Sequence, residues 1–387
     1  MVIGVLRERY EGERRVALVP AAVGQLKKAG FEVLIEASCG ASAGYPDAQY
    51  CNAGCTVEGS RDAVLGRADV LLKVRTCGAD PEHWRDEMSK LPPQAVVVGL
   101  MDPLGQPAVI KEAATLGRVL FALELLPRIT RAQSMDVLSS QANLAGYKAV
   151  LLAANALPKL FPMMMTAAGT ITPSKVFVLG AGVAGLQAIA TARRLGAVVT
   201  AYDVRPAVKE QVESLGARFA EIPLEVGDAQ DAGGYAKALG EDFYRRQAEM
   251  MAGILAESDA VITTAAVPGK KAPVLIQRHM VEGMRPGSVI VDLAAERGGN
   301  CELTRPGEVV EHAGVRIFGP LNLPSEVAFH ASQLYAKNLA NFIMYVAKSG
   351  GISTDTSDEI VAGTLVAREG SVVHPSLLEI LATSEKV

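Results

Sequence analysis

The residues best suited to chemistry lie in one continuous stretch, Lys175–Asp203, which reads KVFVLGAGVAGLQAIATARRLGAVVTAYD. Its GAGVAG segment has the spacing G-x-G-x-x-G, with glycines at Gly180, Gly182 and Gly185. In a dinucleotide-binding turn the first glycine permits the tight turn and the second lets a pyrophosphate approach the backbone. The third glycine lets the following helix pack on the strand. The sequence therefore predicts a pyrophosphate site at this turn, the alternative being a glycine-rich turn without a ligand.

The elements that must position this turn are visible on both sides of it. The continuous apolar run Val176–Leu179 predicts a parallel strand that is buried on both faces. After the turn, Leu186, Ile189 and Ala190 recur at helical spacing, which predicts a helix with these residues on its buried face. The amino end of such a helix offers free N–H groups and a partial positive charge to a phosphate.

An acidic residue follows the second predicted strand, Ala197–Tyr202. Asp203 lies 23 residues beyond Gly180, where a carboxylate can accept both hydroxyls of the adenosine ribose. It would repel a 2′-phosphate, which favours NAD(H) over NADP(H). Arg205 is two residues further on and could contact a 2′-phosphate, so the choice of nucleotide is less sharply defined than dinucleotide binding itself.

A second polar stretch, Glu124–Lys148, precedes the glycine turn. We expect it to lie between two lobes, where its polar groups could bind the carboxamide or the phosphates of a dinucleotide. The alternative is a helix amino end that Asp136 and neighbouring serines cap, with its charges solvated. Its polar residues include Arg128, Arg131, Gln133, Asp136, Ser139, Ser140, Gln141 and Asn143.

Lys73 lies at the end of a predicted apolar strand. It could be a buried base or a Schiff-base former. The alternative is a lysine at a strand end whose charge is solvated.

Composition narrows the possible partners. A net charge of −4 and a pI near 5.9 give no general attraction for nucleic acid or an anionic membrane. The five cysteines form no C-x-x-C pair, so neither a disulfide framework nor a zinc site is expected, and no other metal motif occurs. Since no apolar run approaches the ~18 residues of a membrane helix, we expect the chain itself to be soluble and cytoplasmic.

The chain of 387 residues is long enough for two domains. Predicted strands alternate with helical segments throughout, and long helices are predicted at residues 134–157 and 324–347. The fold class is therefore α/β, with two Rossmann-like domains, each with a mostly parallel sheet, around a central cleft. We expect an N-terminal domain of residues 1–135 plus 325–387 and an NAD(H)-binding domain of 136–324. Further predicted strands are Met1–Leu6, Phe31–Ala37, Ala68–Val74, Ala95–Leu100, Val119–Leu123, Val261–Thr264, Val289–Leu293 and Val315–Phe318.

Several long segments resemble one family. LLPRITRAQSMDVLSSQANLAGY, FPMMMTAAGT, VRPAVKEQVESLGA, GGYAKALGEDF and VDLAAERGGN, with the glycine stretch, are similar to the NAD(H)-binding alpha-1 subunits of proton-translocating NAD(P) transhydrogenase. The resemblance covers essentially the whole chain. It implies a homodimer, peripheral on the inner face of the cell membrane, that exchanges hydride with NADP(H) on a partner beta subunit. Membrane-spanning subunits would couple this exchange to proton translocation.

The resemblance also implies roles for residues around the nucleotide. Arg128 and Gln133 would contact the nicotinamide end of the nucleotide, and Asp136 would orient Arg128. Ser139 would contact the carboxamide of the dihydronicotinamide. The other residues implicated are Ile129 and Thr130 beside Arg128; Val183 at the pyrophosphate turn; Asp203, Val204 and Arg205 around the adenosine; Gly234 and Tyr235 on a mobile loop within 225–247; and Thr264 and Ala265 along the nucleotide groove.

Alanine dehydrogenase is the competing resemblance, because it shares matches at Arg15 and Lys73. That family needs a catalytic histidine at a strand end of the first lobe and an aspartate in the motif V-D-x-A-x-D-Q-G-G. Here the first position falls near Gly99 and the second is Glu296. Without the imidazole the carbonyl of an oxoacid lacks its proton partner, so we expect this activity to be absent or poor, and Arg15 and Lys73 to serve structure. A non-enzymatic NAD sensor or scaffold is the third hypothesis.

Overall fold

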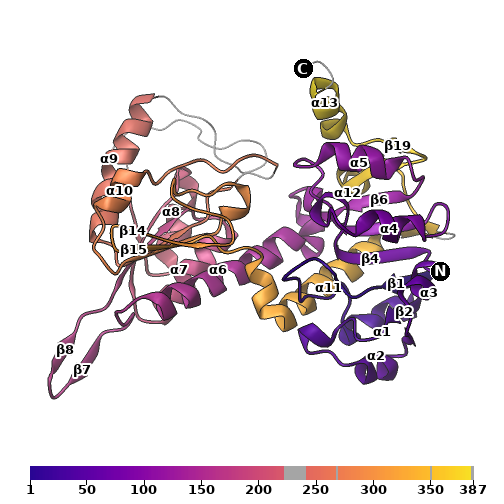
Figure 1. Cartoon of the computed structure of the whole chain (residues 1–387), viewed down its shortest axis with the longest axis horizontal. Helices are drawn as coiled ribbons and strands as arrows, with labels where there is room; N and C mark the ends of the chain where they lie inside the picture. The colour runs from indigo at the N-terminus through magenta and orange to yellow at the C-terminus, as the bar shows by residue number, and fades with distance from the viewer. Residues whose placement is uncertain (222–240, 267–268, 349–350, 385–387) are drawn as a thin grey trace. The chain divides into compact units, whose positions relative to one another are not determined.

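The structure is a computed structural model that describes residues 1–221, 241–266, 269–348 and 351–384 (Figure 1). The chain divides into two compact units, which are described separately below. The first unit contains Met1–Gln141 and Pro324–Val387, and the second contains Ala142–Leu323. Helix α6 (Val137–Ala156) begins in the first unit and ends in the second.

The first unit is built on an eight-stranded sheet with the order β3-β2-β1-β4-β5-β6-β18-β19. Neighbouring strands from β3 to β6 pair in parallel. Strand β18 pairs antiparallel with β6, and β19 pairs antiparallel with β18. The first six strands thus follow the doubly wound order 3-2-1-4-5-6. The strands are β1 (Val2–Val5), β2 (Glu32–Glu36), β3 (Thr56–Glu58), β4 (Val70–Arg75), β5 (Val96–Leu100), β6 (Val119–Ala122), β18 (Leu365–Arg368) and β19 (Ser371–Val372).

Apolar residues cover both faces of this sheet, as a parallel sheet requires. Val70 and Leu72 of β4 face one buried cluster, which includes residues of α11, and Leu71 faces the other. Helix α1 begins at Pro20, a residue that suits the first position of a helix, and Gly30 follows the helix with φ +87°. The helices are α1 (Pro20–Lys28), α2 (Asp47–Ala53), α3 (Arg61–Leu65), α4 (Trp84–Ser89), α5 (Pro107–Ala114), α11 (Ala328–Val346), α12 (Glu359–Thr364) and α13 (Pro375–Ser384).

Short elements connect these helices and strands in the first unit. The segment predicted as one helix at 324–347 consists of a 3₁₀ turn that ends at Val327 and the α-helix α11, which begins at Ala328. The remaining elements are the 3₁₀ turns η1 (Ala41–Ala43), η2 (Cys77–Ala79), η3 (Leu123–Leu125), η4 (Thr130–Met135) and η7 (Leu323–Val327), and the strand pair β16 (Ala347–Lys348) and β17 (Gly351–Ile352).

The second unit contains a seven-stranded sheet with the order β11-β10-β9-β12-β13-β15-β14, again 3-2-1-4-5-6 for its parallel strands. Only β14 pairs antiparallel within this sheet, with β15. The predicted fold class, α/β with two mostly parallel sheets, is therefore confirmed. The strands are β9 (Lys175–Leu179), β10 (Val198–Tyr202), β11 (Arg218–Phe219), β12 (Ala260–Thr263), β13 (Val289–Asp292), β14 (Val309–His312) and β15 (Val315–Phe318).

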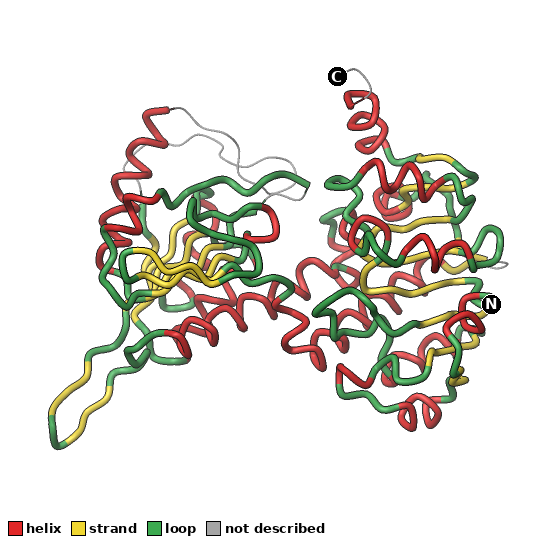
Figure 2. The backbone as a smooth tube through the Cα atoms, viewed as in Figure 1, coloured by secondary structure: helices red, strands yellow, loops and turns green. Residues whose placement is uncertain are grey.

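Helices pack on both faces of the second sheet as well (Figure 2). Val176 and Val178 of β9 belong to one buried cluster and Phe177 to the other, as the continuous apolar run predicts. Among the described residues, no helix combines the length and the apolar character needed to cross a bilayer. The further elements are α7 (Val183–Arg194), α8 (Lys209–Ser214), α9 (Glu241–Glu257), α10 (Arg278–Glu282), η5 (Pro206–Val208) and η6 (Ala295–Arg297).

A hairpin of two short strands extends away from the sheet of the second unit (Figures 1 and 2). It pairs β7 (Met164–Thr166) with β8 (Gly169–Ile171), and all the residues of both strands are exposed. No strand was predicted in this segment. Its apolar residues have no cluster to pack against, so nothing within the described part of this unit buries them.

Candidate dinucleotide-binding site

The strand order of the second unit reverses between β9 and β12. Leu179 and Thr263, the last residues of these two strands, are paired in register. Gly180 and Thr264 therefore leave the sheet side by side. In open α/β sheets, ligands bind outside the carboxyl ends of the strands at such a reversal.

The three fingerprint glycines have three different environments. Gly180 has φ +96°, a conformation that side chains disfavour, and a Cβ there would lie 2.5 Å from Thr264 Oγ1. A Cβ on Gly185 would overlap the carbonyl oxygen of Gly180, so this glycine lets α7 pack directly on the turn. Gly182 is the N-cap of α7. Among the described residues no side chain caps this helix, and a Cβ on Gly182 would meet nothing within 4 Å. No described residue therefore covers the amino end of α7 next to Gly182.

Helix α7 buries a slightly different face from the one predicted. Its buried positions include Gly185, Ala188, Ile189 and Ala192, which lie at i, i+3, i+4 and i+7. Of the three predicted residues, Ile189 is fully buried and Leu186 is partly buried and packs against the same cluster, whereas Ala190 is only partly buried. The third fingerprint glycine belongs to the buried face itself, and Ala188 and Ala192 extend that face beyond the predicted residues. Val183, in the first turn, is 40% exposed.

Asp203 follows β10 and is tied to the glycine turn. Its Oδ2 accepts from the Ala181 N–H at 2.7 Å and from Arg205 Nη2 at 2.8 Å. Its Oδ1 accepts from the backbone N–H and Nε of Arg205, both at 2.9 Å. Burial raises the pKa of Asp203, but the Arg205 guanidinium outweighs burial and holds this pKa below its usual value. The carboxylate that was predicted to meet a ribose is thus ionised and paired with Arg205, while Val204 packs beside an apolar cluster.

Hydrogen bonds join the loop after β12 to the glycine turn, and join the loop after β13 to the loop after β12. Thr264 Oγ1 donates to the carbonyl oxygens of Gly180 at 3.1 Å and Leu179 at 3.3 Å. The backbone of Ala265 pairs with the side-chain amide of Asn300. Asn300 and the buried Asp292 were not singled out from the sequence. The segment VDLAAERGGN carries the signal that could have found them. Asp292 lies near the end of a predicted strand, and Asn300 directly follows two consecutive glycines.

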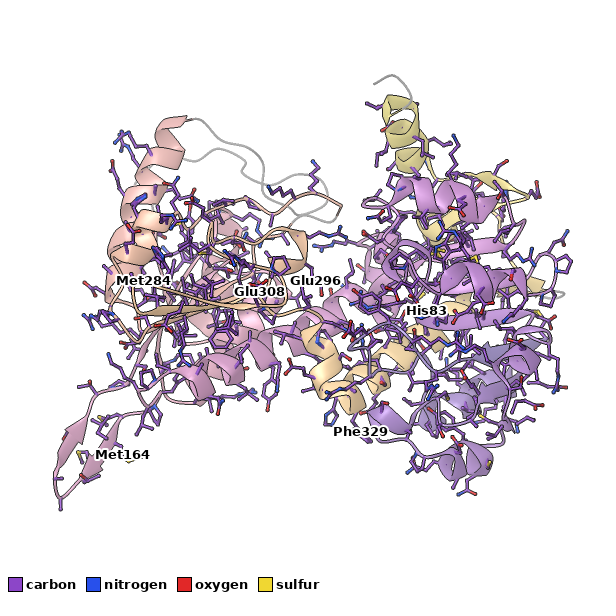
Figure 3. The ribbon with its side chains drawn as sticks, in the orientation of Figure 1. His83, Met164, Met284, Glu296, Glu308 and Phe329 are labelled. Carbon is purple, nitrogen blue, oxygen red and sulfur yellow. The ribbon has the colours of Figure 1, made fainter. Side chains whose placement is uncertain are left out.

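Glu296, which replaces the aspartate of the alanine dehydrogenase motif, lies on the short turn η6 (Figure 3). Its Oε1 accepts from the backbone N–H of Asn322 at 2.7 Å. This contact joins two loops of the second unit. Glu296 thus has a structural partner in this unit.

The residues predicted to contact the nicotinamide, from Arg128 to Ser139, lie in the first unit. Arg128, Thr130 and Gln133 are exposed, and Ile129 packs against the core. Asp136 caps α6, because its Oδ1 accepts from the Ser139 N–H at 2.9 Å and its Oδ2 from the Ser139 hydroxyl at 2.5 Å. The capping role predicted by the alternative is therefore present at Asp136, whereas Ser139 supplies the N–H that is capped. Contact with a nicotinamide remains a prediction for this segment.

The reversal point of the first sheet, between β1 and β4, is occupied by buried ion pairs. Lys73 is fully buried, with Nζ 3.3 Å from Glu8 Oε2 and 3.1 Å from Glu87 Oε2. Burial lowers the pKa of Lys73, but the two carboxylates raise it above its usual value. The solvated-lysine alternative is wrong, and a lysine held as ammonium is unsuited to act as a base or Schiff-base former.

Arg15 has a similar environment to Lys73. It is buried, with Nη2 2.7 Å from Glu13 Oε2 and Nη1 2.9 Å from Gln141 Oε1. Next to it, residues 7–15 with Cys39 and Ser42 line a hollow of about 400 Å³. On β5, a Cβ at Gly99 would lie 2.7 Å from the Lys73 carbonyl oxygen, so the strand leaves no room for an imidazole at that position.

We expect Glu8→Gln to reduce the pH dependence of stability. Burial raises the pKa of Glu8 to about 7, against the opposing effect of the Lys73 ammonium. Because the folded state then holds a proton that the unfolded state releases, stability falls as pH rises from the unfolded pKa towards 7 and then levels off. The slope contributed by Glu8 is at most about 1.4 kcal/mol per pH unit. Urea unfolding at several pH values between 5 and 8 should show a shallower decline for the variant, and parallel curves would contradict the assignment.

Two predicted residues lie outside the described part of the chain. These are Gly234 and Tyr235, together with most of the segment 225–247; only 241–247 is described, as the start of α9. Within the described residues, no group of three or more histidine, cysteine, aspartate or glutamate side chains is arranged to hold a metal ion.

Comparison with known proteins identifies relatives over the whole chain. Residues 4–145 match the alanine dehydrogenase/PNT N-terminal domain, and residues 149–375 match the alanine dehydrogenase/PNT C-terminal domain. The chain is 49% identical over 380 residues to an NAD(P) transhydrogenase subunit alpha chain of Rhodospirillum rubrum, an alignment that covers 97% of this chain and 99% of that protein. A solved structure of transhydrogenase from Sinorhizobium meliloti superposes with a TM-score of 0.85 at 47% identity, covering 96% of this chain and 100% of that one.

Alanine dehydrogenases are more distant. That of Halomonas elongata is 28% identical over 387 residues, covering 98% of this chain and 96% of that protein. The resemblance inferred from the sequence segments is thereby confirmed. The chain belongs to the alanine dehydrogenase/PNT family, within which NAD(P) transhydrogenase alpha subunits are its close homologues.

Proposed function

We propose that this chain is the NAD(H)-binding subunit of a proton-translocating NAD(P) transhydrogenase. The observation that carries the proposal is the 49% identity to a transhydrogenase alpha subunit over 97% of the chain. The subunit exchanges hydride directly between NAD(H) that it binds and NADP(H) on a partner beta subunit. It is catalytic only with its partner subunits, and membrane-spanning subunits couple the exchange to proton translocation. In the cell it is cytoplasmic and peripheral on the inner face of the membrane.

The geometry of the second unit supports NAD(H) as the bound nucleotide. The space beside Gly182 and the amino end of α7 suit a pyrophosphate, because no side chain in the described part of the chain caps the backbone N–H groups there. In this proposal Asp203 accepts the hydroxyls of the adenosine ribose, and these replace some of the hydrogen bonds that the Arg205 guanidinium donates to it. Val183, Val204, Thr264 and Ala265 complete the groove around these groups.

The chemistry proposed for this chain is positioning. A bound nicotinamide supplies the hydride, and hydride transfer between two nicotinamide rings moves no proton, so no general acid or base is needed. Arg128 and Gln133 hold the nicotinamide end, with Ile129 and Thr130 beside them. Asp136 orients Arg128 and keeps Ser139 at the first turn of α6.

The chain also forms a homodimer in this proposal, and the exposed hairpin supports it. Met163 and Met165 are 61% and 75% exposed, and Ile171 is 42% exposed. Residues 161–173 contain no charged side chain. An uncharged apolar surface of this kind is unfavourable in water and is typical of a protein contact. A second copy of the chain presents the same uncharged hairpin, which suits a self-complementary two-fold interface.

We expect the double substitution Met163→Glu with Met165→Glu to convert the dimer into a monomer. Two like charges on each hairpin would repel the second copy and remain solvated in the monomer. Light scattering coupled to gel filtration measures the mass directly. Val309→Glu is the matched control, because Val309 is 57% exposed in the same unit but lies on β14, and it should stay dimeric. A monomeric native chain, or a dimeric double variant, would contradict this interface.

The decisive experiment mixes the purified chain with NADH, an oxidised NAD analogue and an NADP(H)-binding transhydrogenase subunit. The proposal requires the isolated chain to bind NADH with little turnover and to transfer hydride once the partner is added. Unaided oxidation of NADH by pyruvate and ammonium would instead indicate an alanine dehydrogenase. NADH binding without stimulation by the partner would leave only a sensing or scaffold role and overturn the proposal.

A further inference from the structure

A connected hydrogen-bond network fixes the carboxyl ends of β12 and β13 in the second unit. Thr263 and Asp292 end these neighbouring strands in register, and both are fully buried. Asp292 Oδ1 accepts from the Thr263 hydroxyl at 2.8 Å and from the Ala294 N–H at 3.0 Å. Its Oδ2 accepts from the Thr304 hydroxyl at 2.6 Å and from the N–H groups of Asn300 at 2.7 Å and Cys301 at 3.0 Å. Asp292 thus holds the loop that carries Asn300.

Asn300 in turn holds the chain that leaves β12. It is fully buried, and its Oδ1 accepts from the Ala265 N–H at 3.0 Å. Its Nδ2 donates to the carbonyl oxygens of Ala265 at 2.7 Å and Pro273 at 2.9 Å. Its own carbonyl oxygen accepts from Leu275 and Ile276 at 2.8 and 2.9 Å. One side chain therefore satisfies both backbone groups of Ala265 and also binds the carbonyl oxygen of Pro273.

The network continues to the fingerprint turn through the residue before Ala265. Thr264 Oγ1 donates to the Gly180 carbonyl oxygen at 3.1 Å, and the Cβ-free face of Gly180 allows this approach. A shift of Ala265 would therefore carry Thr264 away from the turn that we assign to the pyrophosphate. No part of this path requires Asn300 to touch the nucleotide.

We propose that Asn300 is a positioning residue of the dinucleotide site, which acts by fixing Ala265 and Thr264 against the Gly180 turn. This inference rests on the NAD(H)-binding function proposed above. Two consecutive glycines in left-handed conformation, Gly298 at φ +97° and Gly299 at φ +86°, make the tight loop that turns Asn300 inward. A Cβ on Gly299 would lie 2.7 Å from Asp292 Oδ2, so the loop is built closely around that carboxylate.

The test compares NADH affinity with stability in the full chain. Asn300→Ala leaves both backbone groups of Ala265 unpaired, and we expect NADH binding, measured by calorimetry, to weaken about tenfold. Thr264→Val keeps the side-chain shape but removes the donor to Gly180, and should weaken binding severalfold even if Asn300→Ala fails to fold. Amide hydrogen exchange should show reduced protection around residues 180–186 in both variants.

Ser288→Ala is the matched control at the opposite end of β13. Ser288 is buried and its hydroxyl donates to the Ser258 carbonyl oxygen at 3.2 Å, so the variant also loses one buried hydrogen bond. We expect it to bind NADH like the native chain. Native affinity in both Asn300→Ala and Thr264→Val, or an equal loss in Ser288→Ala, overturns the positioning role. Failure of the native chain to bind NADH would instead remove the proposed function.

Discussion

Gly182→Ala should fold normally and lose most of its NADH affinity. The backbone of Gly182, at φ −75° and ψ −169°, is extended and suits alanine, and its Cβ would meet no atom of the described residues within 4 Å. We therefore expect the melting temperature to stay within about 2 °C of the native value. The methyl group would stand where the pyrophosphate approaches the N–H groups of α7. Losing one charge-assisted hydrogen bond or more to the phosphates corresponds to about 10- to 100-fold in affinity.

Gly185→Ala is the informative contrast, three residues along the same turn. Its Cβ would overlap the Gly180 carbonyl oxygen, and backbone cannot move aside as a flexible side chain can. The variant should lose roughly 1–3 kcal/mol of stability as well as NADH binding. Calorimetric titration and thermal unfolding of both variants separate the two effects. Native affinity in Gly182→Ala would contradict the assignment of this turn to the pyrophosphate.

The glycine turn could be predicted because its requirements are local. The left-handed backbone of Gly180 and the close approach of Gly185 to the Gly180 carbonyl oxygen both arise within one strand, turn and helix, and such local requirements leave a fixed spacing in the sequence. The alternation of apolar strands with helices likewise predicted both sheets. Element ends were displaced by one or two residues, as for Val261–Thr264, which the structure gives as Ala260–Thr263.

The contacts between distant segments could not be predicted in the same way. The Lys73–Glu8–Glu87 pairing joins three segments, and the sequence shows three ordinary charged residues with no spacing that relates them. Asn300 reaches Ala265 across 35 positions, and only the order of β12 and β13 in the sheet brings them together. The hairpin β7–β8 was missed because its strands are three residues long and uniformly exposed, so no alternation marks them.

Arg128→Ala should slow hydride transfer by about 100-fold while changing NADH affinity only slightly. Arg128 is exposed, so truncation does not disturb the core. In the proposed mechanism the chain accelerates transfer by holding the nicotinamide close to its partner, and a misplacement of about 1 Å costs on the order of 100-fold. The residues proposed to bind the adenosine and the pyrophosphate lie in the second unit and are unchanged in this variant, so we expect them to keep most of the affinity. Single-turnover stopped-flow measurement with the NADP(H)-binding subunit gives the rate, and calorimetry gives the affinity.

Arg131→Ala provides the matched control for this prediction. Arg131 is also exposed and lies three residues away, but its guanidinium faces Asp358 at 3.7 Å and Glu359 at 3.6 Å within the first unit. Exposed ion pairs of this kind contribute little, so this variant should transfer hydride at close to the native rate. Equal rate losses in both variants would mean that the segment responds to net charge rather than to one guanidinium. A loss of NADH affinity with an unchanged transfer rate at saturating NADH would show that Arg128 binds the ground state and transition state alike, and would remove its proposed role in positioning.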